Sequence, residues 1–246
     1  MVNFLNSISL VSKMATDDYV GFTFFVGCMA MMAASAFFFF TMNDFDRKWK
    51  TSILISGIIT FIAAVHYFYM RDYWAVVGES PTFFRYVDWT LTVPLMCVEF
   101  YLILKVAGAK PSLMWKLILA SVIMLVTGYA GEAIYTTGSG PAVWGLFSGL
   151  AYFYIVYEIW FGGAKKLAEA AGGAVLKAHK TLCWFVLVGW AIYPLGYMAG
   201  TPGWYDAVGT WGLNMDVIYN IGDAINKIGF GLVVYAAAVA SRAEKA

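Results

Sequence analysis

The chain has 246 residues, of which 61% are hydrophobic and only 13% are charged. A soluble domain is usually about 45–50% apolar and about 25% charged, so the excess of apolar side chains requires an apolar solvent, and lipid is the simplest one. A formal net charge of +1 provides no basic surface for nucleic acid, and the three cysteines all lie in apolar runs, so we expect neither disulfides nor a metal site.

Seven apolar stretches follow one another along the chain. The hydrocarbon core of a bilayer is about 30 Å thick, which requires roughly 20 residues of helix. The stretches cover residues 19–42, 51–70, 81–106, 113–134, 141–161, 181–199 and 212–240, with turn-forming Gly, Pro, Asn and Asp between them. We therefore predict an all-α membrane protein, a single domain over residues 1–246 built as a bundle of seven transmembrane helices.

The positions of the basic residues predict the orientation. Twelve of the sixteen Lys and Arg residues lie in connections, or in the tail, that would share one side of the membrane, whereas only Lys13 and Arg71 lie on the other side. Cytoplasmic loops carry an excess of Lys and Arg. We therefore expect the N-terminus outside and the C-terminus in the cytoplasm.

The third stretch carries several ionisable residues. A charge inside the bilayer costs at least about 2.5–3.5 kcal/mol, so each one suggests a function. Arg85, Asp88 and Thr92 have helical spacing and share one face. Glu99 follows Asp88 by eleven residues, which returns it to that face about 16 Å further along the axis. Alternatively, Glu99 extends to the cytoplasmic interface and contacts water.

The seventh stretch contains Lys227 four residues after Asp223, so the two side chains share a face. A desolvated lysine amine loses its proton readily and can condense with a carbonyl compound. The resulting imine is cationic when protonated, and Asp88 and Asp223 are candidate counter-ions. The alternative interpretation is a buried ion pair that only fastens helices together.

Aromatic residues and prolines near the middle of the stretches suggest a dry pocket. Prolines within a helix produce kinks that can widen an internal cavity. An aldehyde cofactor with a long apolar tail would fit such a pocket, whereas ordinary helix packing is the simpler interpretation. The residues concerned are Trp89, Trp190, Tyr193, Tyr197, Pro94 and Pro194.

Several motifs resemble those of the microbial rhodopsins. The run RYVDWTLTVPLMCVEF at 85–100 looks like their third helix, and WAIYP at 190–194 and DAINK at 223–227 look like their sixth and seventh. The run AVHYFYMR at 64–71 resembles the second helix of proteorhodopsins. The resemblance covers essentially the whole chain. It implies a light-driven outward proton pump, which is an ion transporter rather than an enzyme.

The resemblance also implies the cofactor, the partners and the location of this pump. All-trans-retinal would be bound covalently at Lys227 as a protonated Schiff base. The partners would be the lipid bilayer and protons, and the chain would form a homo-oligomer, a pentamer or a hexamer. Its location would be the inner (plasma) membrane of a prokaryote, which it would cross several times.

The resemblance assigns roles to the charged residues. Asp88 would be the primary counter-ion and proton acceptor, and Asp223 the second counter-ion. Glu99 would be the cytoplasmic proton donor, with Thr92 between acceptor and donor in the Asp–Thr–Glu triplet of outward proton pumps. Arg85 would lie just outside the counter-ions and tune them.

Further positions match the retinal pocket and its surroundings. His66 falls where proteorhodopsins pair a histidine with the acceptor, although a plain helix contact is the alternative. At the position of Met96, relatives have a polar residue for blue absorption and an apolar one for green absorption. Because methionine is apolar, we expect green absorption. The positions matching the pocket are Tyr67, Trp89, Met96, Met124, Gly128, Trp190, Tyr193, Pro194 and Tyr197.

Two departures from well-known relatives bear on function. Bacteriorhodopsin has a pair of glutamates at its extracellular exit, whereas residues 199–209 here contain only Asp206, so we expect late proton release. Gly145 replaces a bulky aromatic residue, and in xanthorhodopsin-like pumps this glycine opens a window for a carotenoid antenna. The alternative is a small residue that permits close helix packing.

Other functions remain as alternatives. A sensory rhodopsin would share the fold, but Glu99 argues against it, because sensors tend to lack a proton donor. Sodium pumps have asparagine where Asp88 stands, and chloride pumps replace this acid. A seven-helix transporter without retinal is the alternative outside the family.

Overall fold

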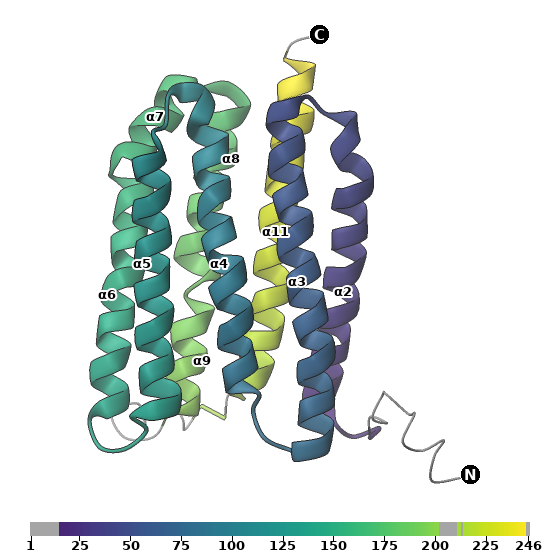
Figure 1. The fold of residues 1–246 in the computed structure, drawn as a ribbon, viewed down its shortest axis with the longest axis vertical. Helices are drawn as coiled ribbons and strands as arrows, with labels where there is room; N and C mark the ends of the chain where they lie inside the picture. Colours follow the sequence, from purple (N-terminus) through teal and green to yellow (C-terminus); the bar gives the residue numbers. More distant parts are fainter. Residues whose placement is uncertain (1–14, 202–210, 213, 245–246) are drawn as a thin grey trace.

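The structure, a computed structural model, describes residues 15–201, 211–212 and 214–244, and these form a bundle of long helices (Figure 1). Within these ranges, seven helical segments are long and apolar enough to cross a membrane. Lys13 and Asp206, which entered the sequence predictions, lie outside them. The helices are α2 (Tyr19–Thr41), α3 (Arg47–Val77), α4 (Thr82–Leu104), α5 (Pro111–Tyr129), α6 (Gly140–Trp160), α7 (Gly163–Ala171), α8 (Gly173–Trp184), α9 (Ile192–Gly200) and α11 (Met215–Ala243).

Short 3-10 and π-helical turns adjoin some of these helices. Two 3-10 turns, η1 (Met42–Asp44) and η2 (Lys105–Ala107), close α2 and α4. Two π-helical turns, η3 (Ala130–Ile134) and η4 (Phe185–Gly189), extend α5 and α8. The fifth span consists of α6 with α7, and the sixth consists of α8, η4 and α9.

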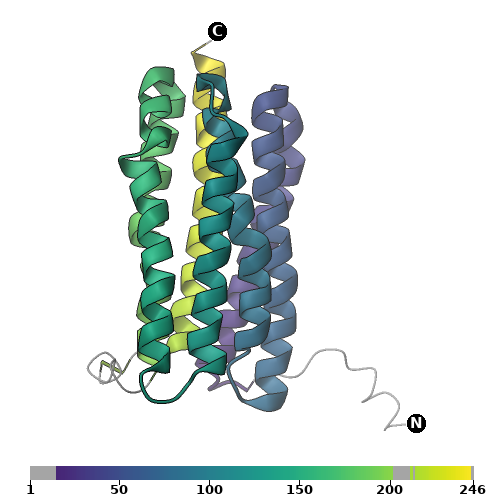
Figure 2. The same ribbon diagram turned by 60° about the vertical axis from the view of Figure 1, so that its left-hand side comes forward.

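Helix α11 turns one face toward the interior of the bundle, while its opposite face exposes Ile221, Ile225 and Leu232. It packs against α2, α3, α8 and α9, and Figures 1 and 2 show it behind the other helices from both directions. The beginning of α2 and the end of α11 lie at opposite ends of the bundle (Figure 1), as an odd number of spans requires. Lys227 lies on the inward face of α11 and is 2% exposed.

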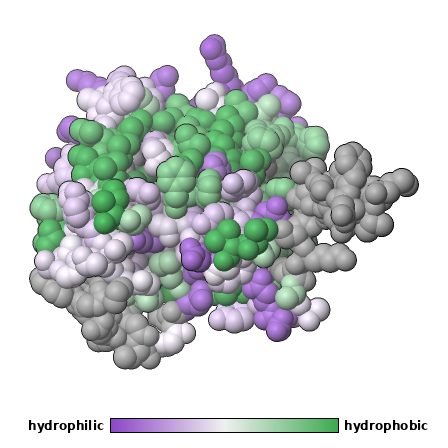
Figure 3. Space-filling model, turned by 60° about the horizontal axis from the view of Figure 1, so that its bottom comes forward, coloured by the Kyte–Doolittle hydropathy of each residue, from purple (hydrophilic) through white to green (hydrophobic). Residues whose placement is uncertain are grey.

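The outer surface of the bundle is apolar. Leu119 and Phe153 are each 61% exposed, and many other large hydrophobic side chains also face outward. Figure 3 shows a broad green apolar area on the flank, with purple hydrophilic side chains more frequent at the end that faces the viewer. Such a surface would promote aggregation in water, whereas lipid solvates it. The fold prediction of seven transmembrane helices is thus confirmed.

Helix α3 and the sixth span both extend well beyond their apolar stretches. Helix α3 extends over Arg47–Val77 instead of 51–70, because Asp46 accepts a hydrogen bond from the Trp49 backbone N–H (3.3 Å) and Gly78 ends the helix with a φ of 74°. The sixth span begins at Gly173 instead of 181. Both extensions contain charged residues, which an apolar window leaves out although they favour helix.

The sixth span is irregular just before Pro194. Trp190 N–H donates to the Phe185 carbonyl (3.0 Å), five residues back, and Tyr193 N–H donates to the Trp190 carbonyl (3.1 Å), three residues back. Pro194 itself has no N–H to donate. The predicted interruption is therefore present in this span, whereas α4 runs through Pro94 without a break.

Side chains of neighbouring helices bind the carbonyls that this irregularity leaves free. The Tyr152 hydroxyl of α6 lies 3.0 Å from the Val186 carbonyl and 2.8 Å from the Leu187 carbonyl. Asn226 Nδ2 of α11 donates to the Gly189 carbonyl (2.9 Å). Because an unpaired buried carbonyl is costly, these two side chains stabilise the π-helical turn.

We expect Tyr152→Phe to lower the free energy of unfolding by about 1–3 kcal/mol, because it leaves a buried carbonyl unpaired. The measurement is the thermal unfolding midpoint in detergent. Tyr154→Phe is the matched control, because Tyr154 lies on the same helix and is 41% exposed. Equal midpoints for the two variants would contradict this account of the turn.

Candidate functional site

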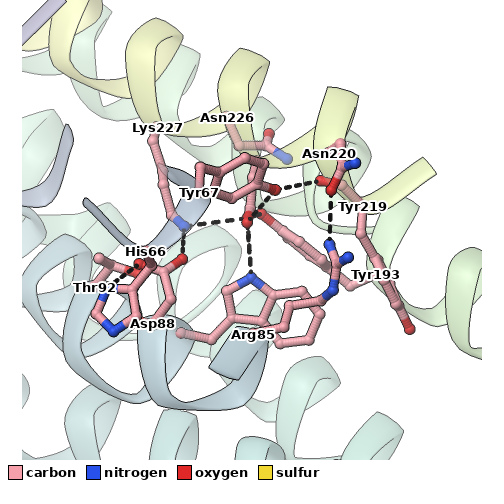
Figure 4. A network of polar contacts seen from close by, with 12 residues as sticks. His66, Tyr67, Arg85, Asp88, Thr92, Tyr193, Tyr219, Asn220, Asn226 and Lys227 are labelled. Atoms are coloured by element: carbon pink, nitrogen blue, oxygen red, sulfur yellow. Dashed lines mark hydrogen bonds and ion pairs between the residues drawn. The ribbon is translucent and has the colours of Figure 1, made fainter. Parts of the chain in front are cut away.

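One cation and two carboxylates meet in the interior of the bundle (Figure 4). Lys227 Nζ donates a hydrogen bond to Asp88 Oδ2 and lies 3.3 Å from Asp223 Oδ1. All three residues are at most 2% exposed. The Asp223–Lys227 contact follows from their spacing on α11, whereas α4 brings Asp88 to the same amine. The cluster thus joins two helices through a single positive group.

Asp223 is surrounded by hydrogen-bond donors. Tyr67 and Tyr193 donate their hydroxyls at 2.8 and 2.7 Å, and Trp89 donates its indole N–H at 3.0 Å to one oxygen and 3.1 Å to the other. Its Oδ1 also lies 3.3 Å from Lys227 Nζ. Both carboxylate oxygens of Asp223 are therefore occupied as hydrogen-bond acceptors.

Asp88 is less fully bonded than Asp223. Its Oδ1 has no hydrogen-bond partner among the residues that the structure describes. His66 Nδ1 lies 3.8 Å from this oxygen and only 2.9 Å from the Ile62 carbonyl. The Thr92 hydroxyl donates to the Asp88 backbone carbonyl (3.0 Å). Asp88 therefore contacts the amine through Oδ2, while Oδ1 is available to accept a further hydrogen bond.

Arg85 lies one helical turn before Asp88 and is fully buried. Its guanidinium donates to Asp216 (2.7 Å) and to Asn220 (3.0 Å), both on α11. It also lies 4.9 Å from the centre of the Tyr219 ring. The direct charge partner of Arg85 is thus Asp216, which the sequence analysis did not single out.

A periodic signal in the sequence could have revealed these partners. Asp216, Asn220, Asp223 and Lys227 follow one another at spacings of four, three and four residues, which is one face of a helix. Only the last two were singled out in the sequence. The whole polar stripe of α11 faces α4 and the interior.

Glu99 lies apart from this cluster and is fully buried. It therefore does not extend to water, which was the alternative for this residue. The Ser56 hydroxyl of α3 lies 2.5 Å from its Oε1, and Oε2 has no partner within the described ranges. The sequence prediction missed Ser56, although Ser52, Ser56 and Thr60 form a polar stripe on an otherwise apolar helix.

A cavity of about 570 Å³ lies between α4, α5, α6 and the sixth span. Its walls are mostly apolar, as in sites for hydrophobic ligands. Met96 is buried and Tyr67 contacts Asp223, but neither residue lines the cavity. Of the pocket positions predicted from the sequence, the cavity is lined by Trp89, Met124, Gly128, Gly145, Trp190, Tyr193, Pro194 and Tyr197.

Residues that contact the charged cluster line one part of the cavity, and residues at the outer surface line another part. Trp89 and Tyr193 line its inner end and donate to Asp223, which lies beside Lys227. Its outer end is lined by α6 side chains that face the exterior, including Leu146 and Leu150, which are 60% and 57% exposed. A long apolar molecule tethered near Lys227 would fit this space.

Comparisons with known proteins agree with this geometry. The family described as bacteriorhodopsin-like protein matches residues 18–241. The green-light absorbing proteorhodopsin of Gamma-proteobacterium EBAC31A08 is 44% identical over 226 residues, which are 91% of this chain and 88% of that protein.

Solved structures give the same result. The crystal structure of the blue light-absorbing proteorhodopsin from Med12 is 42% identical with a TM-score of 0.75, over 90% of this chain and 98% of that one. Xanthorhodopsin, a light-driven ion pump with a dual chromophore, is 26% identical with a TM-score of 0.77, over 92% of this chain and 94% of that one.

Proposed function

Because the chain belongs to the bacteriorhodopsin-like family, we propose that it is a light-driven outward proton pump with retinal bound covalently to Lys227. The observation that carries this proposal is a single buried amine, facing two unequally bonded carboxylates, beside an apolar cavity. The residues around the amine fit retinal, since Trp89, Trp190 and Tyr193 form flat apolar walls. When bound as a protonated imine, retinal supplies light absorption and a change of shape.

Asp88 is the acceptor in this proposal. It already contacts Lys227 Nζ through Oδ2, so a proton needs to move only from nitrogen to oxygen. Asp223 lies only four residues before Lys227, with its Oδ1 3.3 Å from the amine, but its donors Tyr67, Trp89 and Tyr193 occupy its oxygens. The difference in hydrogen bonding thus directs the proton to Asp88.

Glu99 returns a proton to Lys227 Nζ in this proposal. The Ser56 hydroxyl has one proton but two acceptors within reach, the Ser52 carbonyl (3.2 Å) and Glu99 Oε1 (2.5 Å). A protonated Glu99 removes this conflict by donating to Ser56 Oγ. A buried acid without an ion-pair partner is moreover stabilised in its neutral form. Glu99 is thus suited to hold a proton until it is needed.

Direction follows from the order of Asp88 and Glu99 along α4. We propose that the end nearer Glu99 is cytoplasmic, because the connections at that end carry most of the basic residues. We also propose the inner membrane of a prokaryote as the location. The proposed homo-oligomer, a pentamer or hexamer, and green absorption rest on the resemblance alone and stay predictions.

We expect cells that produce the chain with added all-trans-retinal to acidify an unbuffered suspension in light, and a protonophore to abolish the effect. Lys227→Ala should stay colourless and inactive, because the imine needs the amine. Lys180→Ala, at an exposed lysine, is the control. Coloured wild-type protein without any light-induced pH change would favour the sensory alternative, and a covalently coloured Lys227→Ala would refute the attachment site.

We expect Glu99→Gln to slow the recovery of absorbance after a flash by about 10²-fold, because it removes a general acid. Flash photolysis in detergent measures this rate. Glu158→Gln is the control. Glu158 is another carboxyl group, which lies on α6 and accepts a hydrogen bond from the Gly163 backbone N–H. If Glu99→Gln and Glu158→Gln recover at the same rate, Glu99 is not the donor.

We further propose that the opening beside Gly145 admits a carotenoid antenna. Gly145 lines the cavity where it reaches the outer surface along α6. An ideal Cβ at the neighbouring Gly149 would meet no atom within 4 Å, so the opening extends beyond one residue. The structure of xanthorhodopsin, a pump with a dual chromophore, is similar to this chain.

We expect an added carotenoid to contribute its own bands to the action spectrum of pumping, and Gly145→Trp to remove them by filling the opening. Pumping excited directly through retinal should remain. Phe147→Leu is the control, because Phe147 lies on α6 outside the cavity lining and is 51% exposed. A wild-type action spectrum without carotenoid bands would mean that Gly145 serves close packing only.

A further inference from the structure

A further acid, Glu132, is half-buried and lies between the counter-ions and the outer end of the bundle. Glu132 Oε2 accepts hydrogen bonds from the hydroxyls of Tyr86 (2.8 Å) and Tyr219 (3.3 Å). Its Oε1 is buried without a hydrogen-bond partner in the part of the chain that the structure describes. The sequence prediction did not single out this residue, because it lies at the end of an apolar stretch.

Local structure brings Glu132 to this place. It lies in the π-helical turn η3, where Tyr135 N–H donates to the Ala130 carbonyl (2.7 Å), five residues back. The wider turn changes the direction of the side chains at the end of this span. A Cβ at the preceding Gly131 would overlap the Tyr197 hydroxyl, so glycine permits this close approach. Such turns occur frequently at functional sites.

Among the described residues, Glu132 has no cationic side chain as an ion-pair partner. Arg85 and Asp216 act on it electrostatically, but they form an ion pair with each other at 2.7 Å. The Tyr219 ring lies 4.9 Å from the Arg85 guanidinium, and its hydroxyl points to Glu132. A charged carboxylate here would face only hydroxyl donors, so a neutral acid is the less costly resting state.

A continuous set of contacts links Glu132 to the counter-ions. The Trp89 ring lies 4.9 Å from the Tyr86 ring and 5.0 Å from the Tyr219 ring, in edge-to-face contacts. The Trp89 indole N–H donates to Asp223. Arg85 shares α4 with Asp88, one turn away. A change of charge at Asp88 therefore reaches Glu132 through the arginine and the aromatic cluster.

We propose that Glu132 is the proton-release group of this pump, an inference that rests on the proposed function. At rest the Glu132 carboxyl holds a proton. When Asp88 gains the proton of Lys227 Nζ, its negative charge no longer attracts Arg85 inward, and the guanidinium then stabilises a carboxylate on its outer side. Glu132 loses its proton to the extracellular water at this point. Late in the cycle Asp88 returns its proton to Glu132, so that one proton crosses per cycle.

This inference concerns a different segment from residues 199–209, whose composition predicts late release. The two predictions differ in the time at which a proton appears outside. Under late release it would appear when Asp88 loses its proton. Under release from Glu132 it appears when Asp88 gains one.

The test compares the purified holoprotein with its Glu132→Gln variant in lipid vesicles, using a pH-sensitive dye and flash spectroscopy. We expect wild-type release to coincide with proton arrival at Asp88. In Glu132→Gln, release should be delayed until Asp88 loses its proton, while net protons per cycle stay the same. Glu79→Gln, at an exposed acid on the same side, should release like the wild type. Late release in the wild type, or unchanged early release in Glu132→Gln, would overturn the inference.

Infrared difference spectroscopy tests the same group without relying on that variant. In the wild type, the carbonyl band of a protonated carboxyl group should disappear at the time of release, and Glu132→Asp should shift this band. Absence of such a loss would contradict the inference even if Glu132→Gln does not assemble. A wild type that shows no photocycle or no net pumping would instead refute the proposed function, so the two failures can be told apart.

Discussion

The interior of the bundle is organised around one ion cluster, in which the Lys227 amine contacts the carboxylates of Asp88 and Asp223. Burying Lys227 alone would be costly, and burying Asp88 and Asp223 without it would be more so. Their mutual contact therefore fixes the distance between α4 and α11 and the rotation of both helices. The other polar side chains of the interior, such as Tyr67, Trp89 and Tyr193, are arranged around this contact.

The two acids are chemically alike but differ in their surroundings. Asp223 is bound by three donors from three different helices, so any change in its charge would disturb all of them. Asp88 has one oxygen against the amine and one without a partner among the described residues. The two carboxyl groups thus differ in their hydrogen bonding, without any difference in residue type.

The sequence was most informative where a residue type is expensive in lipid. Seven spans, the interior Lys227 and the acids at 88, 99 and 223 could all be predicted, because each stands out against an apolar background. Residues such as Ser56, Asn220 and Tyr219 could not, since hydroxyls, amides and phenols are common in membrane helices. Their importance comes from the partner that the fold supplies.

Helix geometry set a second limit on prediction. The spacing of residues in a regular helix placed Asp88 and Glu99 on one face, but the wide turns at Ala130–Ile134 and Phe185–Gly189 break that regularity. Inside such a turn the side chain of Glu132 points in a direction that no periodic pattern of residues predicts. Pro194 indicated one of the two irregularities, and nothing in the composition of 130–134 indicated the other.

The wide turn of the sixth span has a mechanical consequence. Carbonyl groups of this turn accept hydrogen bonds from the side chains of Tyr152 and Asn226 and not from the helix itself. Water can replace a side-chain donor at little cost, so the span can bend at this point without unwinding. Because Asn226 is the immediate neighbour of Lys227, a displacement of the backbone at Lys227 also moves the hydrogen bond from Asn226 to this turn. A movement at Lys227 is thus transmitted over one residue to the point at which the two halves of the sixth span tilt against each other.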